Sequence, residues 1–452
     1  MVQTSKALRW CLVGLLAVAV AIFGPGVYRG MSDNREDTYQ GLKILSDVIG
    51  LVEKKYVDEV EAKKLIENAI QGMVSSLDPH SSLLTPEAYR DLQIDTQGEF
   101  TGIGIHVTMR DDLVTVISPI EGTPAYRAGI KAADQIVKVD GTPTLDLRDA
   151  VRRMRGPKGT EVVITVLREG QSQPIDFKLV RALIPIHSVK SIALESGYGY
   201  VWVTHFRENT YVDLVDALEK LENQDTPMQG LILDLRDNPG GILDQAIHIS
   251  DLFLEKGVIM SSKGRDDRHT RIYKARSTDA RPRTYPMVVL INDGSASASE
   301  IVAGALQDQK RALIVGTTSF GKGSVQAIES LRDGYALKLT IARYYTPSGR
   351  TIQSKGVEPD IVVPYQDIKA QAEKPRQMLK ESDLANNLNV EPSQKRKAVA
   401  PDGDHSDKDT PSDKPSARLS PLTRDQLLKD NQVRRALDIL VTQGSLQKTG
   451  ND

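Results

Sequence analysis

The alternation of strand-like and helix-like patterns between Tyr198 and Tyr365 limits the fold of this chain more than any other feature. Largely apolar runs, "GYVWV", "GLILDL" and "MVVLI", are separated by stretches such as "YVDLVDALEKLE", where apolar residues recur every three or four positions. Such runs are typical of parallel strands, whose two faces are both buried. Right-handed crossovers place the intervening helices on the sheet, so we predict a layered α/β core over residues 187–365.

Four other regions surround this core in the sequence. Helical spacing predicts an N-terminal helical region over residues 35–95, and short β-like runs between Gly and Pro turns predict a β-rich module over residues 97–183. Residues 366–420 are so rich in polar and charged side chains that we predict a disordered linker. The tail ends in an amphipathic helix over residues 421–445, which we expect to dock on this chain or on a second copy.

The N-terminus predicts export. Lys6 and Arg9 precede the apolar run "CLVGLLAVAVAIFG", and we interpret residues 1–30 as a signal peptide or a membrane anchor. The sequence leaves cleavage open, because the small-residue motif "AVA" interrupts the apolar run. We therefore expect the body of the protein in the periplasm or attached to the cytoplasmic membrane. The single cysteine, Cys11, lies in this segment, so no intrachain disulfide can form.

Charge gives little indication of a binding partner. The 452 residues include 58 Lys and Arg against 60 Asp and Glu, a net charge of -2, and only 5% are aromatic. A nucleic-acid binder is expected to carry an excess of basic residues, which this composition does not have, so we predict no nucleic-acid partner.

The stretch "NDGSASASEIVAGAL" places Ser295, Ser297 and Ser299 where an apolar strand ends and a helical pattern begins. Serine is favoured as a helix N-cap, and this role explains one of the three. A helix N-terminus also stabilises negative charge through its unpaired N–H groups, so a serine there can act as a nucleophile beside an oxyanion site. The strand-to-helix turn alone leaves both roles open.

A second polar stretch, "TTSFGKGSVQ", holds Lys322 between two glycines, with Gln326 four residues later. A lysine in such a turn is more often a solvated surface residue. The stretch is not a phosphate-binding P-loop, because the first glycine of that motif and the Ser or Thr after its lysine are both absent.

Together, "LDLRDNPGG", "GSASASE", "FGKGSVQ" and "YYTPSGRTIQSKGVEPD" resemble the motifs of the carboxyl-terminal processing peptidases, or tail-specific proteases, in the family's order. The resemblance covers about Asp47 to Pro364. It implies that Ser297 is the nucleophile, that Lys322 is its general base, and that Gln326 orients the lysine. It also implies that neither a metal nor an organic cofactor takes part.

A serine–lysine dyad requires a neutral lysine, because only a neutral amine can accept the serine proton. Burial must then lower the lysine pKa from about 10.4 by roughly three units. The oxyanion would be held by the backbone N–H of Ala298 and by that of Gly240 or Gly241, of which we choose Gly240.

Further residues are assigned to the site by the same resemblance. Glu300, Asp234 and Arg236 occur in this form in the family and are expected to support the site, although a purely structural ion pair fits the last two equally well. A histidine-based triad stays open because His205 and His248 belong to the same predicted domain. The helical pattern around His248 is more typical of a packed helix residue.

The β-rich module resembles a PDZ domain, with "GIGI" (Gly102, Ile103, Gly104 and Ile105) at the place of its carboxylate-binding loop. In such domains backbone N–H groups hold a C-terminal carboxylate while the peptide adds as a strand. The resemblance therefore implies protein or peptide substrates bound by their C-termini. An adaptor protein is a further candidate partner, and we expect a homo-oligomer, a dimer or larger.

These observations predict a multidomain α/β serine endopeptidase that cleaves exported proteins and selects them by their tails. Two alternatives are disfavoured. A trypsin-like PDZ protease would carry "GNSGG", and its PDZ domain would follow the nucleophile. A non-catalytic PDZ scaffold or peptide-holding chaperone would have no need of Ser297, Lys322 and Gln326 together.

Overall fold

The structure is a computed structural model that describes residues 37–144, 146–195, 197–266, 270–276, 283–366, 380–384, 386–388 and 422–449. Its contacts divide the chain into two units, Met1–Leu77 and Asp78–Asp452. The predicted signal peptide or anchor and most of the predicted linker lie outside the described residues. In the described part of the chain, no helix combines the length and apolar character needed to cross a membrane.

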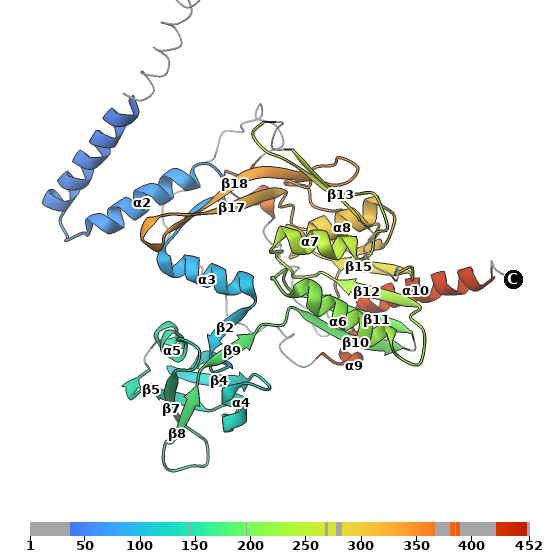
Figure 1. Ribbon diagram of the computed structural model, residues 1–452, viewed down its shortest axis with the longest axis horizontal. Helices are drawn as coiled ribbons and strands as arrows, with labels where there is room; N and C mark the ends of the chain where they lie inside the picture. The colour runs from blue at the N-terminus through green and yellow to red at the C-terminus, as the bar shows by residue number, and fades with distance from the viewer. Residues whose placement is uncertain are drawn as a thin grey trace, which may run out of the picture. The chain divides into compact units, whose positions relative to one another are not determined.

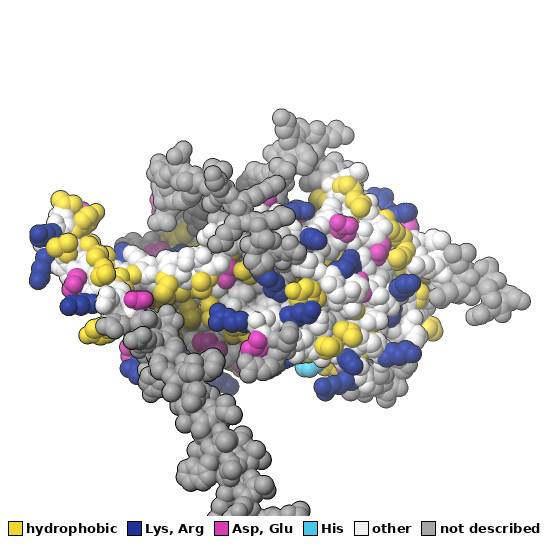
Figure 2. Space-filling model, turned by 90° about the horizontal axis from the view of Figure 1, so that it is seen from above, with side chains coloured by type: hydrophobic (Ala, Val, Ile, Leu, Met, Phe, Trp, Pro, Cys, Tyr) yellow, Lys and Arg dark blue, Asp and Glu magenta, His cyan; other side chains and the backbone are white. Residues whose placement is uncertain are grey.

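The described residues of the first unit form a helix over residues 37–55 and α2 (Ala62–Ser75). Within α2 only Val74 is buried. Hydrophobic side chains remain exposed over the surface of these helices, between charged ones (Figure 2). They include Tyr39, Leu42, Leu45, Val48 and Leu51, which recur at helical spacing.

The second unit contains the β-rich module, an antiparallel sheet in the order β3-β4-β5-β7-β8 with β6 paired to β5. Strand alternation buries Val114, Val116, Ile136, Val162 and Ile164 in its core. The strands and helices are β3 (Ile105–Arg110), β4 (Leu113–Pro119), α4 (Pro124–Ala128), β5 (Gln135–Val139), β6 (Thr142–Pro143), α5 (Leu147–Met154), β7 (Glu161–Leu167) and β8 (Ile175–Val180).

Two strands join this module to the rest of the unit. β2 (Glu99–Gly102) leads into the module and pairs with β9 (Ala182–Pro185), which leads out of it. Before β2 lies α3 (Pro86–Gln97), whose first turn is capped by the Thr85 hydroxyl.

The core sheet follows the predicted alternation. Its order is β10-β11-β12-β15-β16-β19, with parallel pairing from β11 to β19 and an antiparallel β10 at one edge. Three of the apolar runs singled out in the sequence are the adjacent strands β11, β12 and β15. The strands are β10 (Val189–Glu195), β11 (Tyr198–Val203), β12 (Gly230–Asp234), β15 (Met287–Ile291), β16 (Leu313–Gly316) and β19 (Ile361–Val362).

Helices cover both faces of this sheet (Figure 1). One face packs against α6 (Thr210–Glu222), α7 (Leu243–Asp251) and α8 (Ala298–Asp308). The other packs against α9 (Arg424–Leu427) and α10 (Asn431–Thr449). The C-terminal amphipathic stretch thus docks on its own chain, one of the two partners that its pattern left open.

A second sheet carries the chain beyond the Lys322 turn. Its order is β1-β18-β13-β14, and β17 pairs with β18. A short 3-10 helix, η3 (Glu381–Asp383), lies within the stretch that we predicted as a disordered linker, and its Glu381 is buried. The other elements here are β1 (Ser82–Leu84), β13 (Val258–Lys263), β14 (Arg271–Lys274), β17 (Ser324–Ser330), the 3-10 helix η2 (Arg332–Gly334) and β18 (Ala336–Tyr345).

Candidate active site

The three alternating serines differ in their surroundings. Ser295 and Ser299 are fully buried, and their hydroxyls donate to the carbonyl oxygens of Leu235 and Asn238 at 2.7 and 2.9 Å. Ser297 caps α8 with a φ of 53°, in the left-handed region that few residues other than glycine adopt. The outer serines therefore anchor the loop after β12, whereas the middle one lies on a strained turn and lines a cavity.

The loop after β12 approaches this turn closely at Gly240. A Cβ added to Gly240 would lie 2.9 Å from both the Cβ of Ser297 and the backbone nitrogen of Ala298. The Gly240 N–H donates to Oδ1 of Asn238 at 2.9 Å, so this predicted oxyanion donor is already engaged. Among the described residues, the N–H groups of Gly241 and Ala298 have no hydrogen-bond partner.

Lys322 lies on the turn between β16 and β17, and the pKa of its ammonium is below the ordinary value. Burial of the ammonium is the largest cause, and the positive charge of Lys338 adds to it. The carboxylates of Glu381, Glu300 and Asp78 act in the opposite direction. The net direction favours the neutral amine that a lysine base requires.

Glu300 joins the nucleophile turn to the lysine turn. Its Oε2 accepts the backbone N–H of Ser297 at 2.8 Å and that of Lys322 at 2.9 Å. Its Oε1 accepts the N–H of Gly321 at 2.8 Å and the Ser319 hydroxyl at 2.5 Å. Complete burial raises the pKa of Glu300 to about 7 although these four donors oppose the rise. One carboxylate thus holds the backbones of Ser297 and Lys322 side by side.

Tyr344, at the end of β18, makes a second bridge. Its hydroxyl lies 3.0 Å from the carbonyl oxygen of Ser297 and also contacts that of Lys322. Burial raises the pKa of this phenol well above 10, so it stays protonated. The sequence predicts no role for this tyrosine, and its place in the motif "YYTPSG" is its one local signal.

Gln326 lines the same cavity as Ser297. Its amide donates to the hydroxyls of Ser324 at 2.9 Å and Thr340 at 3.3 Å. Thr340 in turn donates to Asp78 at 3.1 Å. Orientation of Lys322 by Gln326 stays a prediction.

Asp234 and Arg236 form a buried ion pair at the end of β12, with Arg236 Nε 2.9 Å from Asp234 Oδ1. The same guanidinium donates to Asp430 at 2.9 Å and to Gln432 at 2.6 Å, at the start of α10. The pair therefore fastens the C-terminal helix to the sheet, which is the structural ion-pair role that the sequence left open.

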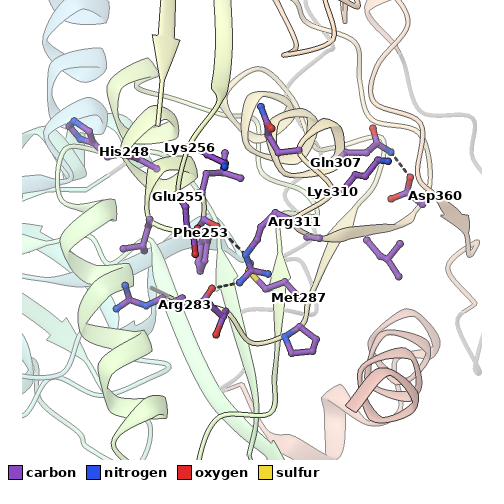
Figure 3. A pocket seen from close by; sticks show the side chains of 18 of the residues that line it. His248, Phe253, Glu255, Lys256, Arg283, Met287, Gln307, Lys310, Arg311 and Asp360 are labelled. Atoms are coloured by element: carbon purple, nitrogen blue, oxygen red, sulfur yellow. Dashed lines mark hydrogen bonds between the residues drawn. The ribbon is translucent and has the colours of Figure 1, made fainter. Parts of the chain in front are cut away.

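The two histidines occupy different cavities. His205 lines the cavity of about 380 Å³ at Ser297, and burial, with the positive charge of Arg207, lowers its pKa. His248 lines another cavity, of about 1250 Å³, together with Arg283 and Arg311 (Figure 3). The structure thus separates His248 from the nucleophile but leaves His205 beside it.

In the β-rich module, "GIGI" links β2 to β3. Gly102 ends β2, Ile103 is buried, and Ile105 begins β3. Gly104 has a φ of 79°, and a Cβ there would lie 2.4 Å from the Cβ of Thr123. Among the described strands, β3 is at the sheet edge, with β4 as its one neighbour, so its other edge can accept an added strand.

Comparison with protein families gives matches in the order of these parts. Residues 197–363 match peptidase family S41, and residues 101–179 match the PDZ domain. Residues 27–88 match the N-terminal domain of the activating protease CtpB. The predicted order of N-terminal helices, PDZ domain, α/β protease core and C-terminal helix is confirmed.

Individual relatives agree. A carboxy-terminal-processing protease of Bartonella bacilliformis is 48% identical over 336 residues, which are 74% of this chain and 77% of the relative. A carboxyl-terminal-processing protease of Synechocystis sp. is 39% identical over 323 residues, 69% of this chain and 74% of the relative. A solved structure of a photosystem II D1 C-terminal processing protease is 31% identical, covers 71% of this chain and 92% of its own, and has a TM-score of 0.41. The chain belongs to peptidase family S41, as a carboxy-terminal processing serine protease with a PDZ domain.

Proposed function

We propose that Ser297 is the nucleophile of this protease and that neutral Lys322 is its general base. The Ser297 oxygen attacks the scissile carbonyl as its proton moves to the Lys322 amine, which then protonates the leaving amine. Water releases the acyl group in a second step. The observation that carries the assignment is the Glu300 carboxylate, whose Oε2 accepts the backbone N–H of both residues.

The oxyanion donors that we propose are the N–H groups of Ala298 and Gly241. Both lack a hydrogen-bond partner among the described residues and belong to residues that line the Ser297 cavity. Gly240 contributes differently, because only a residue without a side chain allows the loop to approach Ser297 so closely. Such backbone donors stabilise the charge that develops on the substrate carbonyl.

The test is the initial cleavage rate against pH for wild type and for Ser297→Ala, Lys322→Ala, Lys322→Arg and His205→Ala. We expect the first three variants to be inactive, since a guanidinium stays protonated and cannot accept the serine proton. Wild-type activity should fall as pH drops through the pKa of Lys322. Circular dichroism should show that each variant is folded.

His205→Ala is the decisive comparison, because His205 is the histidine that lies in the Ser297 cavity. We expect it to keep the acid limb of the wild-type profile. A folded Lys322→Ala enzyme that cleaves at the wild-type rate, or a loss confined to His205→Ala, would overturn the serine–lysine assignment.

We further propose that the substrates are exported proteins chosen by their C-terminal tails. The "GIGI" loop and the open edge of β3 support selection by C-terminal tails. The apolar N-terminal segment supports export. The enzyme would then lie in the periplasm or on the cytoplasmic membrane. A C-terminal alkaline phosphatase fusion should be active in cells, and carbonate extraction should separate an anchored chain from a released one. An inactive but intact fusion would contradict export.

A homo-oligomer is also proposed, supported by the exposed apolar side chains of the N-terminal helices (Figure 2). Exposed hydrophobic side chains that recur along one helix are typical of an interface. Light scattering should give a mass above one chain for wild type and a smaller mass for Leu42→Glu. A monomeric wild type would contradict the proposal.

A further inference from the structure

Glu381 is a buried acidic residue next to the Lys322 turn. It belongs to η3, within the polar stretch after the core, yet its side chain is 0% exposed. Its backbone N–H donates to the carbonyl oxygen of Phe320 at 3.3 Å, two residues before Lys322. A polar segment thus buries a carboxylic acid against the lysine turn, where burial is costly unless the acid has partners.

The partners of Glu381 lead directly to that turn. Gln353 donates its amide to Glu381 Oε1 at 2.8 Å, and its own Oε1 accepts the backbone N–H of Gly323 at 2.9 Å. His80 Nε2 lies 2.8 and 2.7 Å from the two oxygens of the same carboxylate. A Cβ on Gly323 would lie 2.6 Å from the Gln353 backbone nitrogen, so the two segments are in close contact. Glu381 is therefore one side chain away from the residue that follows Lys322.

The charges that act on Lys322 come from four elements or their flanks. Lys338 on β18 disfavours the ammonium, whereas Glu300 on α8, Asp78 before β1 and Glu381 on η3 favour it. His80 faces Glu381 and can offset its charge when protonated. Of the three carboxylates, Glu300 accepts backbone donors of the two catalytic turns, and Asp78 accepts backbone donors and hydroxyls next to β1.

We propose that Glu381 is a positioning residue of the active site, which holds the Lys322 turn through Gln353 and stabilises the ammonium that forms when Lys322 takes the proton of Ser297. The proposal rests on the proposed role of Lys322 as general base. The proton moves from Ser297 Oγ to Lys322 Nζ, and Glu381 takes no part in the transfer itself. A base must be strong enough to take the proton in the transition state, so a nearby negative charge assists this step even though burial opposes it.

The charge and the hydrogen bonds of Glu381 can be separated by substitution. Glu381→Gln removes the charge and keeps an acceptor for Gln353, whereas Glu381→Asp keeps the charge and shortens the reach. Lys338→Met removes the opposing positive charge. Ser382→Ala is the matched control, because Ser382 is exposed on the same 3-10 helix.

The experiment is kcat/KM against pH for these variants of the full chain, with an unstructured peptide that ends in a free carboxylate as substrate. Loss of the Glu381 charge disfavours the ammonium, so Glu381→Gln should move the acid limb to lower pH by on the order of one unit and lower the plateau roughly tenfold. Lys338→Met should move the limb to higher pH. Glu381→Asp, which draws the charge back from the turn, should move the limb to lower pH by less than Glu381→Gln does, and Ser382→Ala should match wild type.

The outcomes are distinguishable. A Glu381→Gln limb at the wild-type position overturns the proposal, because a purely structural role would lower the rate without moving the limb. If Glu381→Gln does not fold, Glu381→Asp decides, because its shorter side chain draws the charge back from the Lys322 turn: a limb moved to lower pH supports the proposal, and an unmoved limb overturns it. If Lys322→Ala keeps wild-type activity, the general-base assignment fails instead.

Discussion

Among single residues, Glu300 connects the nucleophile turn directly to the lysine turn. Its place in the motif "GSASASE" gives no indication of the second contact. It was predicted only as a supporting residue. In the structure its two oxygens collect four donors from the two turns, three of them backbone N–H groups. A group with this many local donors fixes the position of both turns, so its loss should affect catalysis and stability together.

Ionisation of Glu300 gives a prediction with a definite sign. Burial raises its folded-state pKa to about 7, above the value of 4.5 expected when unfolded. The folded enzyme therefore holds a proton that the unfolded chain releases, and the stability that this contributes is present below pH 4.5 and lost as pH rises through about 7. Relative to Glu300→Gln, wild type should lose up to about 3 kcal/mol of stability between pH 4.5 and 8.

The measurement is the urea midpoint of wild type and Glu300→Gln across that range. Glu329→Gln, an exposed glutamate on β17, serves as the control and should follow wild type at every pH. Parallel curves for wild type and Glu300→Gln would show that the Glu300 carboxyl does not change its protonation within this window.

Two parts of the site, the serine run and the lysine turn, could be predicted from the sequence. The serine run and the Gly-Lys-Gly turn are local patterns, and each names its own candidate residue. Tyr344 and Gln353 lie in the motif "YYTPSGRTIQSKGVEPD", but nothing local singles out either of them or His80. Their partners are contributed by segments distant in the chain: Tyr344 contacts Ser297, and His80 contacts Glu381 across 301 positions. Only folding brings these groups together, so their roles could not be read from spacing.

At the scale of elements, α10 is a part of the protease core and not an appendage. Val433, Ala436, Leu437 and Leu440 are buried against strands of the central sheet. The alternation of strands and helices predicted a sheet covered by helices, but a helix joined through a long polar stretch gives no signal of where it docks. The apolar face of α10 predicted that this helix is buried. The structure shows that it packs against β12 and β15.

Two neighbouring positions of α10 test this packing. Leu440 is 0% exposed and Val441 is 40% exposed. Leu440→Ala should destabilise the protein by about 2–5 kcal/mol because it leaves a cavity between helix and sheet. Val441→Ala should change stability by less than about 0.5 kcal/mol. Thermal unfolding compares the two, and equal melting temperatures would mean that α10 does not cover the sheet in solution.

At the scale of the whole molecule, the protease joins a catalytic core to a module built to hold a peptide end. The open edge of β3 follows the "GIGI" loop directly, so a bound peptide would pair with β3 while its carboxylate meets the loop. Substrate choice would then depend on a chemical group far along the substrate from the bond that is cut. This separation makes the two functions testable independently.

The carboxylate itself is the first test. Two peptides of one sequence, one ending in the free acid and one in the amide, differ only in the charge that the loop would hold. Hydrogen bonds to a charged group contribute about 1.5–3 kcal/mol, so kcat/KM should be lower for the amide by roughly ten- to a hundredfold. Rates are compared below saturation, where kcat/KM governs cleavage. Equal rates for acid and amide would contradict carboxylate selection.

A matched pair of glycines locates the effect in the loop. Gly104 and Gly170 have φ values of 79° and 82°, so alanine is strained to a similar degree at both. A Cβ would collide with Thr123 at Gly104 but meets open space at Gly170. Gly104→Ala should therefore bring the acid and amide rates together by slowing cleavage of the acid, while Gly170→Ala keeps the wild-type ratio. If both variants keep that ratio, the carboxylate is held somewhere other than the "GIGI" loop, because the collision at Gly104 must displace the backbone that would bind it.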